Sequence, residues 1–166
     1  MPTHIKWSDG QAKCDADSFA HVDDDMPLPE GDVIVSLARF QREGEQLLSQ
    51  DRRVGVRVEA GETVEALAYD LPRISAVALA FPKFRDGRAY SAAMVLRTRL
   101  SYAGEVRAVG DVLLEQAPFM IRCGFDAFEP ADGTNAAQWT QAGRRFRHVY
   151  QRAADALTPA FVERGG

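Results

Sequence analysis

The sequence predicts a single α/β domain with a parallel, roughly five-stranded sheet flanked by helices. Three observations lead to this prediction. The 166 residues suit one domain with one core, because domains cluster at about 100–150 residues. From residue 32 onward, short apolar runs alternate with longer amphipathic stretches, a pattern typical of parallel strands joined by right-handed helical crossovers. Within the runs polar and apolar residues mostly do not alternate, which favours strands covered on both faces.

The first 30 residues differ from the remainder in charge and in pattern. They carry two Lys residues against seven Asp and Glu residues and show no sustained period. They end in an acidic, Pro-rich stretch that cannot lie inside a helix. We therefore interpret residues 1–30 as an N-terminal arm that the core does not need, with a hairpin signal around Ser8-Asp9-Gly10, and residues 31–160 as the α/β domain.

Strands and helices are expected in alternation along that domain. The strands are expected at residues 33–37, 54–58, 76–80, 106–109 and 125–128, and the helices near residues 39–50, 63–71, 88–101, 112–123 and 135–157. Asp86 and Asp111 are candidate N-caps, Gly124 is placed to end the fourth helix, and Pro118 should kink or split it. A flavodoxin-like sheet and a partial β/α barrel both fit, and we favour the open flavodoxin-like sheet because eight units are absent.

Composition and charge limit the classes of function. The hydrophobic content of 46%, the charged content of 27% and the net charge of −4 are ordinary for a globular protein. No apolar run reaches the roughly 20 residues of a membrane span and no apolar signal segment begins the chain, so we expect a cytoplasmic protein without membrane contact. Residues 83–122 carry seven Lys and Arg against four Asp and Glu, an excess that suits a small anion better than a nucleic acid.

Patterns that bind metals or cofactors are missing. Cys14 and Cys123 are far apart and form no CxxC pair, so neither a zinc site nor a disulfide framework is indicated. GxGxxG, Walker, HExxH and GxSxG patterns do not occur, and we expect no cofactor and no metal. His4, His21 and His148 lie away from the expected strand ends and are interpreted as surface residues.

The segment 81–91 is the richest candidate for a site, because ligands of parallel α/β sheets bind beyond the carboxyl ends of the strands. It contains three cations, three aromatic residues and one carboxylate. It either forms an anion pocket, with Arg88 and helix N-terminal amides around a phosphate-like or sulfate-like group, or is a solvated loop in which Asp86 caps a helix.

Arg107 lies within an expected strand, where a charged side chain needs a partner or a ligand. Its counter-ion could be Asp86, Asp111 or Asp126, or Arg107 could lie at the sheet edge and reach solvent. We expect Asp86, Arg88 and Arg107 to converge at the carboxyl edge of the sheet. The candidate anion-binding residues are Arg88, Arg107, Tyr90, Ser91, Gly87 and Gly110, and the candidate general bases are Asp86 and Asp111.

Three blocks, residues 81–91, 102–112 and 122–128, together resemble a bacterial family catalogued as domain of unknown function 934, often labelled an oxidoreductase. The resemblance covers about residues 30–150. It implies a pathway rather than a reaction, since members are encoded beside assimilatory sulfite or nitrite reductase and phosphoadenylylsulfate reductase. The family-like positions are Phe81, Pro82, Phe84, Asp86, Gly87, Arg88, Tyr90, Ser91, Arg107, Gly110, Asp111, Arg122, Cys123, Gly124, Asp126 and Phe128.

The resemblance and the cationic loop together favour an accessory protein of assimilatory sulfate or sulfite reduction that binds a small anion or docks on the reductase. One alternative is an independent enzyme on an anionic substrate, with Asp86 or Asp111 as base and Arg88 and Arg107 as clamps. The other is a structural interaction subunit. The expected partners are a sulfite or nitrite reductase, a small anionic metabolite and a second copy of the chain.

Overall fold

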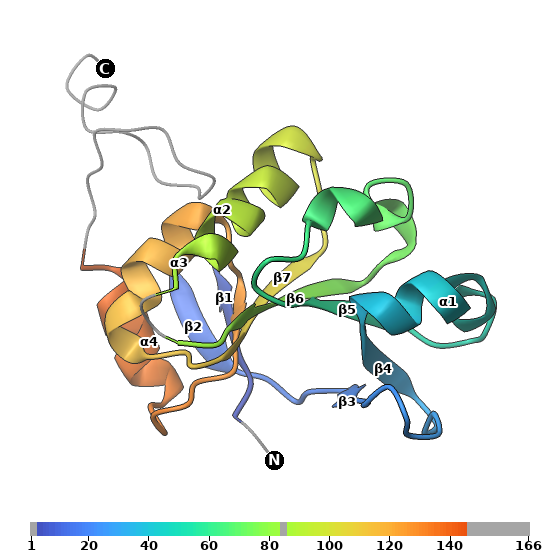
Figure 1. Ribbon diagram of the computed structural model, residues 1–166. Helices are drawn as coiled ribbons and strands as arrows, with labels where there is room; N and C mark the ends of the chain where they lie inside the picture. Colours follow the sequence, from blue (N-terminus) through green and yellow to red (C-terminus); the bar gives the residue numbers. More distant parts are fainter. Residues whose placement is uncertain (1–2, 84–85, 146–166) are drawn as a thin grey trace.

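The computed structural model describes residues 3–83 and 86–145. Across these two ranges, eight strands form one curled, mixed sheet, and the helices gather on one of its faces (Figure 1). The α/β class is thereby confirmed, whereas the sheet is larger than the five-stranded parallel one expected. The strand order is β2-β1-β8-β7-β6-β5-β4-β3, in which β3 to β8 run parallel and β1 is antiparallel to both of its neighbours.

The elements have the following bounds. The strands are β1 Ile5–Ser8, β2 Gln11–Cys14, β3 Phe19–His21, β4 Asp32–Ser36, β5 Val54–Val58, β6 Ala76–Phe81, β7 Glu105–Gly110 and β8 Ala127–Phe128. The α-helices are α1 Leu37–Leu48, α2 Arg88–Met94, α3 Ala117–Cys123 and α4 Ala136–Gly143. Short 3-10 turns lie at Val64–Leu67 (η1), Leu71–Arg73 (η2) and Leu114–Gln116 (η4), and a π-helical turn continues α2 over Val95–Arg99 (η3).

The parallel strands follow one another in chain order, so every crossover advances the sheet in the same direction. Right-handed crossovers that all advance one way place their helices on the same face. This is the arrangement of a partial β/α barrel. A flavodoxin-like order reverses direction and puts helices on both faces, so our preference for that order was wrong.

The connection between β2 and β3 explains the curl of the sheet. These two strands form opposite edges, and seven strand spacings of about 4.8 Å would separate them by about 34 Å in a flat sheet. Cys14 and Phe19 are five residues apart, a stretch that spans at most about 18 Å. The sheet therefore curls toward the face opposite the helices, and residues 15–18, called here the crossing segment, run over that face (Figure 1).

Residues 5–21 belong to the sheet, unlike the separate arm we expected. They form β1, β2 and β3, and Ile5 and Ala12 are buried in the core. The expected hairpin is confirmed, with Asp9 and Gly10 both at positive φ in the turn between β1 and β2. The division at residue 30 thus does not coincide with a boundary of the sheet.

The expected helices are confirmed in part. The stretch 63–71 forms two 3-10 turns instead of an α-helix. The stretch 112–123 is split as Pro118 indicated, and Pro118 lies in the first turn of α3, where its missing amide costs no hydrogen bond. Gly124 ends α3 at φ 107°. Residues 146–157 of the last expected helix lie outside the described residues.

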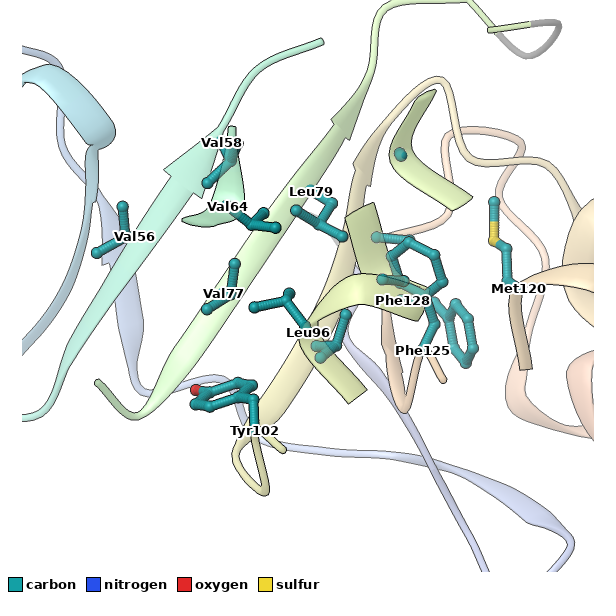
Figure 2. Packing of buried hydrophobic residues seen from close by; sticks show 14 of the residues in the cluster. Val56, Val58, Val64, Val77, Leu79, Leu96, Tyr102, Met120, Phe125 and Phe128 are labelled. Carbon is teal, nitrogen blue, oxygen red and sulfur yellow. The ribbon is translucent and has the colours of Figure 1, made fainter. Parts of the chain in front are cut away.

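The main core lies between the sheet and its helices (Figure 2). Val77 and Leu79 of β6 point into it and pack with side chains such as Leu96 and Phe128. Side chains alternate along a strand, so Ala78 and Ala80 lie on the opposite face. We call this helix-free, concave side the inner face; its small apolar cluster comprises Ile34, Ala78, Ala80 and Val109, with Phe19 packed against it.

Candidate functional site

The loop after β6 brings together the two residues that the sequence singled out first. The Arg88 guanidinium donates to the Asp86 carboxylate through Nε at 3.0 and 3.2 Å and through Nη2 at 2.6 Å. The backbone amide of Arg88 also donates to Asp86, at 3.1 Å. The hydrogen bonds from Arg88 lower the pKa of Asp86 to about 2, so Asp86 is a weak base at neutral pH.

The residues around this loop serve the fold. The Tyr90 hydroxyl donates to Gln116 at 2.6 Å, the ring packs edge-on against Phe81, and burial raises the pKa of Tyr90 to about 12. Gly110, at φ 88°, lets the backbone pass so close to Phe81 that a Cβ would lie 2.5 Å from the Phe81 carbonyl oxygen. The Asp111 amide donates to that oxygen at 2.7 Å.

Two further candidates lie at the start of α2. Gly87 is its N-cap, without a side-chain cap hydrogen bond, and Ser91 is exposed on the helix. Asp86 does not cap the helix in the usual way, since its carboxylate is directed to Arg88 alone among the contacts described.

Arg107 does not join this group. It pairs in register with Ala78, so its side chain lies on the inner face, whereas α2 and Arg88 are on the helix-covered side. The expected convergence of Asp86, Arg88 and Arg107 was therefore wrong, because alternate residues of β7 face opposite sides of the sheet and Arg107 is on the inner one.

The partners of Arg107 are three carboxylates. Its guanidinium donates to Glu105 at 2.6 Å, to Asp17 of the crossing segment at 2.8 and 3.1 Å, and to Glu129 at 2.9 Å. The side chain is completely buried. Burial alone would lower the pKa of Arg107, but the hydrogen bond to Asp17 and the charge of Glu105 raise it above its ordinary value. Arg107 is thus a permanently charged centre of the inner face.

His21 extends this network to the end of β3, where sequence reasoning missed it. Its Nε2 lies 2.8 Å from Oε2 of Glu129, the same oxygen that accepts from Arg107. Burial would raise the pKa of Glu129, yet the hydrogen bonds and charges of His21 and Arg107 lower it. The His21 side chain is 31% exposed. No sequence signal could have found it, since Glu129 lies 108 residues away in the chain.

His4 also departs from the surface position expected for the histidines. It is buried at the inner face, 3.7 Å from both Asp15 and Glu105. His148 lies outside the described residues.

A cleft of about 480 Å³ opens beside His21, at the carboxyl ends of β3, β4 and β5. We call it the inner cleft; its lining includes His21, Asp23, Asp24, Ser36, Arg57 and Glu59. The hollow beside Arg88 is much smaller, about 20 Å³, and is lined in part by Glu59 and Glu62. Within residues 3–83 and 86–145, no group of three or more His, Cys, Asp and Glu side chains is arranged to hold a metal ion.

The fold is that of a small α/β protein whose sheet is arranged like part of a β/α barrel. Comparison with known families then places the chain in one family. A model of a family described as "Bacterial protein of unknown function (DUF934)" matches residues 55–161, more than half of the chain. The protein belongs to this family. Comparison with curated proteins finds none that matches. Within the described ranges, no helix has the length and apolar character needed to cross a membrane.

Proposed function

We propose that this protein is an accessory protein of assimilatory sulfite reduction that docks on the reductase through the loop after β6. The pathway is the one implied by the family resemblance. The docking mode rests on the state of Arg88, the cation at the first residue of α2, directly after this loop.

The Arg88 side chain is 62% exposed and already forms a bidentate ion pair with Asp86. A small anion entering the adjacent hollow would meet Glu59 and Glu62, and the hollow has room for about one water molecule. A protruding arginine with its own counter-ion is better suited to a protein surface, since Arg is enriched in interfaces while enclosed pockets hold small ligands. The single observation that supports docking over anion capture is this exposed, internally neutralised pair.

Binding to the cognate sulfite reductase tests the proposal. Isothermal titration or size-exclusion chromatography should detect a complex, and Arg88→Ala should weaken it by at least about tenfold, the loss of one charge-assisted contact. The matched control is Arg99→Ala, because Arg99 is 69% exposed and its carboxylate partner Glu65 lies 3.7 Å away. That variant should bind like the unmodified protein.

Absence of a complex, or equal weakening by both substitutions, would contradict docking through this loop. Thermal-shift measurements with sulfite, sulfate, phosphate and adenosine phosphosulfates test the anion mode in parallel. A stabilisation that disappears in Arg88→Ala would replace docking with anion capture. The enzymatic alternative draws no support from Asp86, whose lowered pKa of about 2 makes it a poor general base.

A further inference from the structure

The inner cleft lies in the part of the fold where ligands of β/α proteins bind. It opens at the carboxyl ends of three parallel strands, β3, β4 and β5, and its volume of about 480 Å³ falls within the range of small-molecule sites. Arg88 is not part of its lining and lies on the helix-covered side, although Glu59 lines both the inner cleft and the hollow beside Arg88.

The buried network fixes the tautomer of His21, a residue that lines this cleft. Arg107 can only donate, and an ionised Glu129 can only accept. The His21 Nε2 that shares the Glu129 oxygen must therefore carry its hydrogen. When the imidazole is neutral, the other nitrogen, Nδ1, carries a lone pair and can accept a hydrogen bond.

The remaining polar lining combines one cation with several acceptors. Within the described residues, the Arg57 guanidinium is held by one hydrogen bond, from Nε to Glu59 at 2.6 Å. The Asp24 carboxylate accepts from the Ser36 hydroxyl at 2.5 Å and retains further lone pairs. Asp23 also lines the cleft. A purely anionic ligand would meet these carboxylates, and a purely cationic ligand would meet Arg57.

We propose that the inner cleft binds a small α-amino acid, with the carboxylate of the ligand on Arg57 and its ammonium group on Asp24 and His21 Nδ1. A zwitterion satisfies both signs of charge at once. The guanidinium fork matches a carboxylate in geometry, and an ammonium group has three donors for the acceptors opposite. The hydrogen-bonded series Arg107–Glu129–His21 then has a role beyond linking strands of the sheet, because it positions the acceptor nitrogen Nδ1 of His21.

A thermal-shift screen of the full chain with each of the twenty L-amino acids at about 10 mM tests the proposal. At least one should raise the melting temperature by about 2 °C or more. The amine and the carboxylic acid obtained by removing one of its two charged groups should be much weaker, with affinities at least about tenfold lower by calorimetry. His21→Gln should weaken binding of the amino acid, although the glutamine amide can still donate a hydrogen bond to Glu129.

Arg57→Met should abolish the stabilisation, and Arg73→Met is its matched control. Arg73 is 44% exposed, against 38% for Arg57, and is likewise paired with carboxylates, but it lies in η2, outside the inner cleft. The proposal is overturned if no amino acid stabilises the protein, if Arg57→Met binds as well as Arg73→Met, or if the deaminated acid binds as tightly as the amino acid.

Discussion

The two faces of the sheet are built from different chemistry. The helix-covered face is apolar, with Val77, Leu79 and Phe81 of β6 completely or almost completely buried. The inner face carries the equally buried Arg107, surrounded by carboxylates from β7, from the crossing segment and from the residue after β8. One sheet therefore separates a core stabilised by removal of apolar surface from water and a face on which a buried charge is compensated by its neighbours.

Because of this difference, substitutions on the two faces should reduce stability in different ways. An apolar core loses stability in proportion to the volume removed, and neighbouring side chains relax in part. A compensated charge network behaves asymmetrically, because removal of one partner leaves the others buried and uncompensated. Both faces also depend on residues close to the N-terminus, since β1 joins the sheet and Asp17 reaches Arg107.

Removal of residues 1–29 should have the largest effect. The shortened chain lacks β1, β2, β3 and the crossing segment, so it exposes one side of β8 and β4 and deprives Arg107 of Asp17. We expect it to lose its cooperative thermal transition when measured by circular dichroism beside the full chain. A cooperative transition near the original temperature would instead mean that the remaining strands suffice and that the arm interpretation holds.

Arg107→Met should cost about 3–5 kcal/mol of unfolding free energy, since it leaves one buried and two partly buried carboxylates without their shared cation. Leu79→Ala on the opposite face is the comparison, with an expected cost of about 2–5 kcal/mol. Urea unfolding at pH 7 and pH 3 separates the two mechanisms. The cost of Arg107→Met should shrink at pH 3, where the freed carboxylates become protonated, and the cost of Leu79→Ala should not. Equal pH dependence would refute the contrast between the faces.

The stability of the unmodified protein should fall in acid. Burial alone would raise the pKa of Glu105, but the neighbouring His4 and Arg107 lower it to about 2, and the pKa values of Asp17 and Glu129 are lowered too. A carboxylate with a lowered folded-state pKa contributes its stability above the unfolded value near pH 4.5, and this contribution is lost as the pH falls toward 2. Glu105 alone accounts for a loss on the order of 3 kcal/mol, offset in part by Asp126, whose pKa burial raises.

Urea unfolding between pH 7 and pH 2 checks this slope. Glu105→Gln should flatten the curve, whereas Glu45→Gln should leave it almost unchanged, because Glu45 is fully exposed and pairs with Arg73 at the surface. A curve that is level down to pH 2 would show that the inner-face carboxylates are not held in their charged form by the fold.

The helix-covered face could be predicted from the sequence, and the inner face could not. The apolar runs of β4 to β8 identified their strands correctly. In β6, however, Ala76, Ala78 and Ala80 are small apolar residues that fit any environment, so the run does not reveal which residues face the helices. β1 and β2 were expected only as a hairpin in a separate arm, and β3 was not expected. All three strands are short and largely polar on one side, and the acidic residues among them resembled a solvated arm.

The candidate site was predictable only where its contacts are local. Asp86 and Arg88 are two residues apart, and their pairing follows from the turn between them. The need of Arg107 for a counter-ion was also predictable, but the counter-ions we considered were wrong: they are Asp17, Glu105 and Glu129, of which Asp17 lies 90 residues away. Asp126 instead contacts Arg97 at 3.3 Å. Glu105 is two residues from Arg107 in β7 and was a local partner that we missed, whereas Asp17 and Glu129 depend on strand order, which no local pattern encodes.

The distant partners of the β1–β2 hairpin limit when it can join the sheet during synthesis. The β1–β2 hairpin has its sheet partner in β8, near residue 127, and the amide of Ala12 donates to the Thr140 hydroxyl in α4. The residues of this hairpin therefore cannot form their native contacts until almost the whole described chain has been synthesised. Since distant contacts form slowly and leave strand edges unpaired in the interval, the β1–β2 hairpin should complete its native contacts late in folding.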